Sequence, residues 1–281
     1  MNNHVTIVTV CYNSMAVLPE MLRSLPSETP IVLVDNQSDD RTTLMALARK
    51  HDARIILNDN NVGFGPACNQ GAALANTEFL LFLNPDAALQ EGAIAALIES
   101  AQTHPAASGF NPRILDGKGK QSFRHGSKIK PAERLKGPVP AQDSIVSVLA
   151  GSAIFCRRDL FNKIGGFDPA IFMYHEDDDL SLRLRDHGPL MYCHAATVIH
   201  LSGHGSPRSP ATAAFKAYYS ARSRTYVLGK YGHPRPKLNT LLASIGRVVG
   251  PDTLFSKRRR AKNFGYLKGA LSALKHGGGQ S

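Results

Sequence analysis

The sequence lacks any long apolar run. A stretch such as FLLFL, at residues 79–83, is far shorter than the roughly 20 residues that a membrane-spanning helix needs. The first ten residues, MNNHVTIVTV, also lack the basic region and the long apolar segment of a secretory signal. We therefore expect a protein that stays in the cytoplasm.

Cysteine is scarce as well. The four cysteines, Cys11, Cys68, Cys156 and Cys193, lie far apart, and no C-x-x-C pair occurs. A disulfide framework and a structural zinc site both depend on cysteines at characteristic spacings. We therefore expect reduced thiols, most of them buried.

Two common nucleotide-binding fingerprints are absent. No G-x-G-x-x-G follows the first predicted strand, which argues against a dinucleotide site, and no Walker A sequence occurs. The glycines of NVGFGPACNQG come after the third predicted strand, where a P-loop does not fit. A ligand would then be held mainly by carboxylates, by amides and, where one binds, by a metal ion.

The first third of the chain contains alternating apolar and helical patterns. The predicted strands lie in HVTIVTVCYN, IVLVDNQS, ARIILND and EFLLFLNPD, and the predicted helices in SMAVLPEMLRSL, DRTTLMALARK and PACNQGAALAN. Continuous apolar strands separated by helices predict an α/β fold, with a mainly parallel sheet covered by helices on both faces. The 281 residues, 43% of them hydrophobic, can bury a large core in one domain, alone or with an appendage.

Each of the four predicted strands ends in Asn or Asp, within CYN, VDNQSDD, NDNNVGFG and NPD. Turn geometry alone favours these residues, so one such loop means little. Four in succession favour a binding site, because ligands bind at the carboxyl ends of the strands in such sheets. Asp86, at the end of the fourth strand, is a candidate ligand for Mg²⁺ or Mn²⁺, which bind diphosphate oxygens. The alternative is a helix-capping role.

The formal net charge of +11 is compatible with nucleic acid, a membrane surface or a polyanionic ligand as partner. Much of the excess lies in SKRRRAKNFGYLKGALSALKHGGG, at residues 256–279. The apolar residues of this segment follow helical spacing: Phe264, Leu267, Leu271 and Leu274. A basic amphipathic helix of this kind binds an anionic bilayer surface. The alternative is that the stripe packs on the rest of the protein or on a second subunit.

Several segments occur in the order and spacing of family 2 glycosyltransferases. The chain resembles the rhamnosyltransferase-like branch of that family over about residues 4–232, through VTIVTVCYN, VDNQSDD, NVGFGPACNQG, LFLNPD, GSAIFCRRDLFNKIGGFDPAIFMYHEDDDLSLRLRDHG and AATVIHLSGHGS. The resemblance implies a GT-A (nucleotide-diphospho-sugar transferase) fold, a nucleotide-sugar donor, a divalent metal and inversion at the anomeric carbon. We expect a GT-A domain at residues 1–232 and a basic helical C-terminal extension at 233–281.

The resemblance also implies roles for individual residues. Those expected at the nucleotide-sugar site are Tyr12, Asn13, Asp35 and Asn36, around the base and ribose, together with Asn61, Gly63, Asn69, Gly151 and Ser152. Asn84, Pro85 and Asp86 occupy the place of a D-x-D metal motif, with a neutral Asn instead of the first acid. His200 occupies the place of a metal ligand or a donor to the diphosphate, and His204 is a second candidate.

Four consecutive acids, Glu176 to Asp179, begin a helical pattern. An inverting transfer needs a base for the acceptor hydroxyl, and the resemblance implies the pair Glu176 and Asp177, with Asp177 as that base. Helical geometry places Asp177 above an inward-facing stripe, Asp178 toward solvent, and Asp179 within reach of Arg183. Crowding by like charges can raise the pKa of such a base. The alternative is that the acids only complement the helix dipole.

The resemblance thus implies an inverting glycosyltransferase in cell-surface polysaccharide synthesis, and the basic tail predicts peripheral binding to the inner face of the cell membrane. dTDP-rhamnose is favoured over a UDP-sugar as donor, with a glycan or lipid-linked acceptor. The Q-x-x-R-W motif of processive synthases is missing, which predicts transfer of one sugar per encounter.

Two other classes of protein stay open. A sugar-nucleotide nucleotidyltransferase would carry a Gly-rich basic loop after the first strand, where this chain has CYNSMAVLPE. A nonenzymatic nucleic-acid- or membrane-binding protein would explain the charge but not the acidic site. We therefore expect no nucleic-acid partner.

Overall fold

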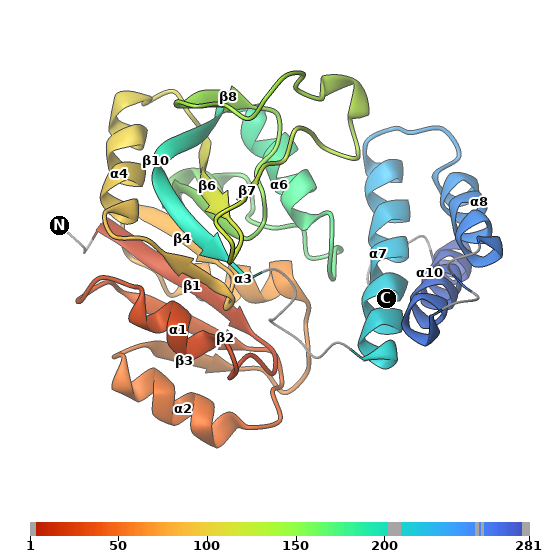
Figure 1. Cartoon of the computed structure of the whole chain (residues 1–281), viewed down its shortest axis with the longest axis horizontal. Helices are drawn as coiled ribbons and strands as arrows, with labels where there is room; N and C mark the ends of the chain where they lie inside the picture. Colours follow the sequence, from red (N-terminus) through yellow and green to blue (C-terminus); the bar gives the residue numbers. More distant parts are fainter. Residues whose placement is uncertain (1–3, 202–208, 251–252, 254–255, 277–281) are drawn as a thin grey trace.

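The computed structural model of the chain describes residues 4–201, 209–250, 253 and 256–276. Within these ranges the strands form one mixed sheet in the order β3-β2-β1-β4-β9-β6-β10-β5, with β7 beside β6 and β8 beside β10. Figure 1 shows the sheet in the larger part of the molecule and the last helices to one side. The strands are β1 (Val5–Cys11), β2 (Ile31–Asp35), β3 (Arg54–Leu57), β4 (Phe79–Leu83), β5 (Ala87–Leu89), β6 (Gly109–Leu115), β7 (Gln121–Ser122), β8 (Ser144–Val146), β9 (Ala153–Arg157) and β10 (Leu190–His200).

The N-terminal part of the sheet is parallel, as the sequence predicted. The strands β3, β2, β1 and β4 pair in parallel, and every residue of β1, β2 and β4 is buried. Burial on both faces explains why these strands are continuously apolar. The rest of the sheet is mixed, because β9 runs antiparallel to β4 and β6, while β10 is parallel to β6 and antiparallel to β5.

Helices cover both faces of the sheet. One buried apolar cluster includes α1 (Leu18–Arg23), α2 (Arg41–Lys50) and α4 (Ala93–Thr103). The other cluster includes α3 (Phe64–Ala73), α5 (Arg158–Lys163) and α6 (Glu176–Arg185). A short 3-10 helix, η2 (Pro131–Glu133), lies between β7 and β8. The predicted α/β class is therefore confirmed.

All four cysteines are free thiols in buried positions, as expected. Burial raises the pKa of each thiol above its ordinary value. A thiolate is therefore disfavoured near neutral pH, which argues against a nucleophilic cysteine.

Three further helices follow the sheet: α7 (Pro210–Lys230), α8 (Pro236–Val249) and α10 (Lys257–His276). The C-terminal end of α7 is attached to the sheet domain, because Lys230 Nζ lies 2.6 Å from both Asp168 Oδ2 and Asp179 Oδ1. The helices α8 and α10 pack on α7, and Figure 1 shows α8 on the side of α7 away from the sheet. Among the helices that the structure describes, none is long and apolar enough to cross a bilayer.

Candidate active site

The ends of β4 and β10 meet at a carboxylate and an imidazole. Asp86 lies in the turn between β4 and β5, and His200 is the last residue of β10, which pairs with β5. The His200 Nε2 atom lies 3.1 Å from Asp86 Oδ1, although the two residues are 114 positions apart. Asp86 is buried. The structure thus brings together the two residues that the sequence selected as metal ligands.

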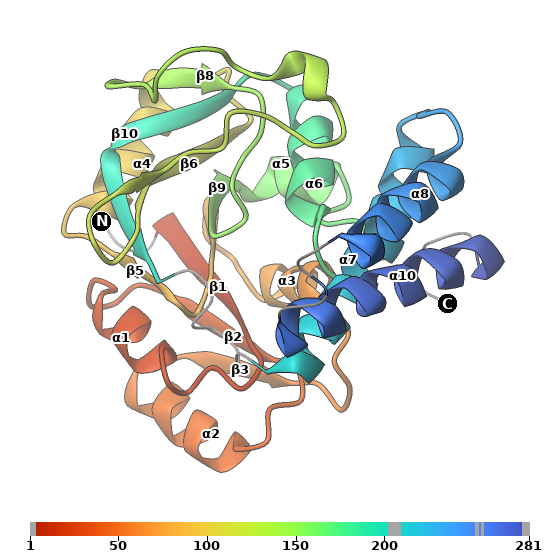
Figure 2. The same cartoon turned by 45° about the vertical axis from the view of Figure 1, so that its right-hand side comes forward.

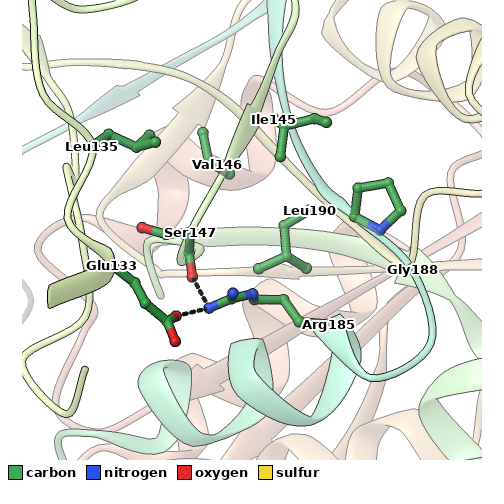
Figure 3. A pocket seen from close by; sticks show the side chains of 9 residues that line it. Glu133, Leu135, Ile145, Val146, Ser147, Arg185, Gly188 and Leu190 are labelled. Carbon is green, nitrogen blue, oxygen red and sulfur yellow. Dashed lines mark hydrogen bonds and ion pairs between the residues drawn. The ribbon is translucent and has the colours of Figure 1, made fainter. Parts of the chain in front are cut away.

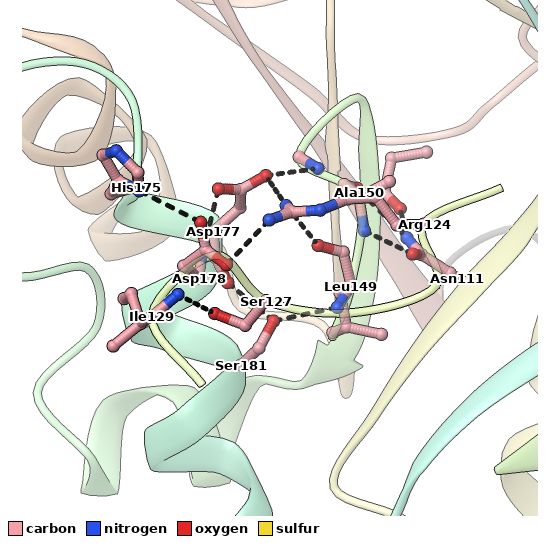
Figure 4. A network of polar contacts seen from close by, with 12 residues as sticks. Asn111, Arg124, Ser127, Ile129, Leu149, Ala150, His175, Asp177, Asp178 and Ser181 are labelled. Atoms are coloured by element: carbon pink, nitrogen blue, oxygen red, sulfur yellow. Dashed lines mark hydrogen bonds and ion pairs between the residues drawn. The ribbon is translucent and has the colours of Figure 1, made fainter. Parts of the chain in front are cut away.

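A second cluster of polar side chains surrounds the N-terminus of α6 (Figure 4). Asp177 Oδ2 accepts a hydrogen bond from Gly151 N at 3.1 Å and is paired with the guanidinium of Arg124. Asp177 Oδ1 accepts a bond from Asp178 N at 2.9 Å. The side chain of Asp177 is 19% exposed, so the carboxylate is held in place and is still reachable from solvent.

The turn formed by Gly151 and Ser152 joins these two clusters. Gly151 N donates to Asp177, and the Ser152 carbonyl accepts a 3.0 Å bond from Asn84 N. A Cβ atom at Gly151 would lie 3.1 Å from Asp177 Oδ2 and 3.3 Å from Asp177 Cβ, so a side chain there would press on the carboxylate. Two adjacent residues therefore hold the acidic end of α6 beside the Asn84–Asp86 turn.

Arg124 is a site residue that the sequence analysis missed. It belongs to the segment between β7 and β8, and its guanidinium contacts Asp177 and lies 2.7 Å from Asp178 Oδ1. Burial lowers the pKa of Arg124, but Asp177 and Asp178 more than offset this, so that the pKa is raised above its usual value. The guanidinium is therefore charged and neutralises part of the acidic cluster. Nothing in the surrounding GKGKQSFRHGSKIK distinguishes this cation from its neighbours.

The prediction that Asp178 faces solvent is wrong. Asp178 is 2% exposed, with Oδ1 at Arg124 and Oδ2 at 3.2 Å from His175 Nδ1. Burial alone would raise the pKa of Asp178, but the bond to His175 and the charge of Arg124 lower it to about 2. The segment between β7 and β8 covers this side of α6, which the helical pattern of α6 could not reveal.

Asp179 pairs with Arg183 at 2.8 Å, as predicted. The same carboxylate also anchors α7, because Tyr231 Oη donates to Asp179 Oδ1 at 2.9 Å beside Lys230. Asp179 is fully buried. Its contacts therefore connect α6 to α7 instead of facing a ligand.

The surroundings of Glu176 disfavour its charged form. The residue is half-buried, but Oε2 is shielded from solvent and has no hydrogen-bond partner among the described residues. Burial, followed by the charges of Asp177 and Asp178, raises the pKa of Glu176 to about 8. Glu176 is therefore mostly protonated at neutral pH, and the cluster carries less negative charge than four consecutive acids suggest.

Most of the residues predicted to hold the base and ribose lie on loops that are bonded to one another after β1, β2 and β3. Asn36 Nδ2 donates to the Gly63 carbonyl at 3.0 Å, and Asn61 Oδ1 accepts from Gly63 N at 3.0 Å. Asn13 Oδ1 accepts from a backbone N–H of the loop after β2 at 2.8 Å. Tyr12 is exposed at the end of β1. These polar groups therefore gather at the carboxyl ends of the parallel strands.

Two other predicted residues are engaged in contacts with the surrounding chain. Asp35 is buried, accepts from Ser38 N at 3.1 Å and lies 3.0 Å from Arg41 Nε. Asn69 binds the backbone of Phe167 in both directions, with 2.8 Å for each hydrogen bond. In this structure both side chains position the loops around the site.

Asp86 and His200 fit a divalent cation as part of a shared coordination shell. The part of the chain that the structure describes contains no group of three or more His, Cys, Asp or Glu side chains that could hold a metal. Mg²⁺ at phosphate sites usually binds one or two carboxylates, substrate phosphates and water. One carboxylate and one imidazole are therefore compatible with a cation that is shared with a diphosphate. The second candidate, His204, lies outside the described residues.

A separate pocket opens at the C-terminal end of α6 (Figure 3). It has a volume of about 390 Å³, and an ion pair between Glu133 and Arg185 borders it. Its lining includes none of the predicted site residues. We therefore place the candidate site at the opposite end of α6.

Comparison with known protein families decides the classification. The model of glycosyl transferase family 2 matches residues 6–165. The chain belongs to glycosyl transferase family 2. The match includes Asp86 and the Gly151–Ser152 turn and ends before α6, so the acidic cluster lies beyond the matched segment of this glycosyltransferase.

Curated relatives of this glycosyltransferase include two rhamnosyltransferases. The N-acetylglucosaminyl-diphospho-decaprenol L-rhamnosyltransferase of Mycobacterium tuberculosis is 29% identical over 249 residues, which cover 75% of this chain and 80% of the relative. Rhamnosyltransferase WbbL of Escherichia coli is 26% identical over 247 residues, which cover 78% of this chain and 91% of the relative. The resemblance to the rhamnosyltransferase-like branch is thereby confirmed.

Solved structures confirm the GT-A fold. The structure of S. aureus TarS 1–349 aligns with this chain with a TM-score of 0.56 and 14% sequence identity. The alignment covers 97% of this chain and 91% of the TarS chain. GalNAc-T7, solved with UDP, GalNAc and Mn²⁺, has a TM-score of 0.57 and 15% identity. The alignment with GalNAc-T7 covers 97% of this chain but only 56% of the GalNAc-T7 chain.

Proposed function

We propose that this glycosyltransferase transfers rhamnose from dTDP-rhamnose to a lipid-linked acceptor, with inversion, in cell-surface polysaccharide synthesis. Both relatives described above are named for rhamnose transfer, and the mycobacterial one is named for an acceptor on decaprenol diphosphate. A UDP-sugar is the alternative donor, and a glycan without a lipid is the alternative acceptor. We propose that the protein acts in the cytoplasm, bound peripherally to the inner face of the cell membrane.

The Gly151–Ser152 turn is the observation that carries this proposal. It bonds to Asp177 on one side and to the Asn84–Asp86 turn on the other. A transfer of this kind needs a base for the acceptor and a charged site for the departing diphosphate, on opposite sides of the anomeric carbon. The turn connects a group suited to each role.

We assign the role of base to Asp177. The acceptor oxygen attacks the anomeric carbon as the bond from that carbon to the diphosphate oxygen breaks, and the acceptor proton passes to Asp177. Arg124, Gly151 N and Asp178 N use three acceptor positions of this carboxylate. A carboxylate has about four such positions, so one is available for the acceptor hydroxyl.

We assign the diphosphate to the other side of the turn. Asp86 and His200 would hold Mg²⁺ or Mn²⁺, and such a cation, when bound, neutralises the charge that develops on the departing diphosphate. Asn84 stands where a D-x-D motif has its first acid, and its amide can donate a hydrogen bond to the nucleotide-sugar. Lys216 of α7 is close enough to interact electrostatically with Asp86 and adds a positive charge near this position. The loops that carry Tyr12, Asn13, Asp35, Asn36, Asn61, Gly63 and Asn69 would bind the base and ribose.

The test is a panel of donors incubated with the full chain and a short-chain polyprenyl-diphosphate acceptor bearing N-acetylglucosamine. We expect transfer from dTDP-rhamnose, with one sugar added as read by mass spectrometry and the anomeric configuration inverted as read by NMR. Transfer from a UDP-sugar alone would contradict the proposed donor. Synthesis of a nucleotide-sugar from a nucleoside triphosphate and a sugar phosphate would instead identify a nucleotidyltransferase.

A further inference from the structure

Helix α8 is amphipathic, but its large apolar side chains lie on the exposed face and small polar side chains lie on the buried face. Its outer face carries large exposed apolar side chains at spacings of three and four residues: Leu238, Leu242, Ile245 and Val249. Leu242 is 57% exposed and Val249 is 77% exposed, whereas Thr240 and Ser244 are fully buried. A helix of a soluble protein normally directs its apolar stripe inward. A contiguous exposed stripe marks an interaction surface, although isolated exposed apolar residues are common.

Helix α10 buries Tyr266 in a cluster with Ala217 and Ala221 of α7, but it leaves most of its predicted apolar stripe exposed. It packs on α7 through small residues, because a Cβ atom at Gly265 or Gly269 would overlap the backbone of Ala214 or Tyr218. The larger side chains of the stripe that the sequence predicted are Phe264, Leu271 and Leu274, all exposed, and Leu267, which is half-buried. Phe264, Leu271 and Leu274 thus keep 44%, 45% and 37% of their surface exposed, so their packing on the rest of the chain is incomplete, and packing on a second subunit stays open.

The two helices lie side by side and run antiparallel. Lys237 Nζ at the start of α8 donates to the Leu274 carbonyl at 2.9 Å. Asn263 Nδ2 in α10 donates to the Arg247 carbonyl near the end of α8 at 2.9 Å. Figure 2 shows α8 and α10 next to each other, in front of α7. Their exposed apolar residues therefore belong to one region of the molecule.

This region is also the main source of the positive charge of the protein. Residues 233–281 contain ten of the 33 Lys and Arg residues but only one of the 22 acidic residues. Exposed cations on the two helices include Lys237, Arg247, Arg258, Arg260 and Lys268. Apolar side chains beside a dense positive charge match the two layers of an anionic bilayer surface, the acyl boundary and the phosphate headgroups.

We propose that Leu238, Leu242, Ile245 and Val249 of α8, with Phe264, Leu271 and Leu274 of α10, form a docking surface for an anionic phospholipid bilayer. The apolar side chains enter the headgroup boundary, and the flanking cations bind lipid phosphates. The proposal rests on the proposed lipid-linked acceptor, which would be concentrated at the same surface, and it assigns the larger part of the contact to α8, which the sequence analysis did not select.

The charge of the surface decides between a bilayer and other occupants. A second copy of this chain would bring two strongly positive surfaces together, and like charges repel. Single-stranded nucleic acid is usually bound by several aromatic side chains that stack on the bases, whereas the exposed apolar residues of α8 are aliphatic and Phe264 is the one aromatic residue of the proposed surface. An anionic bilayer satisfies both the charge and the aliphatic stripe.

The docking surface is connected to the candidate site through α7. The helices α8 and α10 pack on α7, and Lys230 at the end of α7 lies 2.6 Å from Asp179 Oδ1, two residues from Asp177. The position of the docking surface relative to the proposed base therefore depends on α7.

The test is co-sedimentation of the full chain with phosphatidylcholine vesicles, with and without phosphatidylglycerol, at low and high salt. We expect binding to the anionic vesicles at low salt, weaker binding to neutral vesicles, and a loss of about tenfold or more in the double variant Leu242→Asp/Ile245→Asp. The matched control is Ile145→Asp, which adds a carboxylate at an exposed isoleucine of β8. Its vesicle binding should equal that of the unchanged protein, and thermal melting should show that both variants are folded.

Three outcomes would overturn the docking surface. In the first, the unchanged protein stays in the supernatant with anionic vesicles at low salt. In the second, the double variant pellets as well as the unchanged protein. In the third, light scattering shows a dimer of the unchanged protein without vesicles, and the double variant does not form it. Donor hydrolysis without acceptor or vesicles separates this proposal from the proposed function. If the double variant hydrolyses dTDP-rhamnose normally but does not bind vesicles, both stand. If the unchanged protein binds vesicles but uses no nucleotide-sugar, only the function fails.

Discussion

Replacing Glu176 by glutamine should stabilise the protein at high pH and have little effect near pH 5. The pKa of Glu176 is raised from 4.5 to about 8 by burial and by the charges of Asp177 and Asp178. Oε2 has no hydrogen-bond partner among the described residues to stabilise the ionised form. Glutamine keeps the shape of the side chain and can never take the negative charge.

The sign of the effect follows from the proton count. Between pH 4.5 and about 8 the folded state holds a proton on Glu176 that the unfolded state has released. The free energy of unfolding therefore falls as the pH rises through this window, and the loss is complete above pH 8. A shift of this size corresponds to on the order of 5 kcal/mol at most, because side chains and water can rearrange around the ionised group. Even about 1 kcal/mol would change the melting temperature by about 2–4 °C in a protein of this size class.

The assay is thermal unfolding of the unchanged protein and the Glu176→Gln variant from pH 5 to pH 9. The melting temperature of the variant minus that of the unchanged protein should grow up to about pH 8 and then level off. Glu133→Gln is a control of opposite sign, because a hydrogen bond from Arg185 lowers the pKa of Glu133. That variant should gain no stability in the same range. A difference that stays constant from pH 5 to pH 9 would show that Glu176 titrates like an ordinary glutamate, and the reasoning would be refuted.

Three further predictions concern catalysis. Asp177→Asn should fold and bind donor normally but lower the transfer rate by about 10²-fold or more, whereas the exposed Asp186→Asn should not; an active Asp177→Asn variant would move the base elsewhere. Asp86→Ala should weaken binding of a nucleoside diphosphate more than of a nucleoside, as read by calorimetry with Mg²⁺ or Mn²⁺, and full activity in excess EDTA would show that no metal is needed. Gly151→Ala places a Cβ 3.1 Å from Asp177 Oδ2 and should lower kcat by about tenfold with an unchanged KM for the donor. If donor affinity also fell by about tenfold, the substitution would have disturbed the nucleotide-sugar site and not the position of Asp177.

The parts of the fold that the sequence predicted are those with strong local signals. The strands β1, β2 and β4 are apolar throughout because both faces are covered. The antiparallel insertion of β9 between β4 and β6 has no comparable local signal, because pairing direction depends on distant segments. The division of the chain after residue 232 stays a prediction. The helix α7 ends at Lys230, but it packs on α8 and α10 as well as on the sheet domain.

The candidate site shows the same contrast between local and distant information. The resemblance selected Asp86 and His200, which the structure brings within 3.1 Å, and helical spacing predicted the pair of Asp179 with Arg183. Arg124 could not be found in this way, because its partners lie 53 and 54 positions further along the chain. The environment of Asp178 was misjudged for the same reason.

The four consecutive acids differ in their surroundings. Glu176 is mostly protonated at neutral pH, Asp178 is paired inside the protein, and Asp179 is bound by Lys230 at the end of α7. Asp177 keeps a carboxylate that is 19% exposed, so the acids at this point combine the proposed base with groups that hold the structure together. Asp179 lies only two residues from Asp177, and α7 also carries the helices of the proposed docking surface. The position of the proposed base and the attachment of the helices of the proposed docking surface therefore depend on the same short stretch of α6.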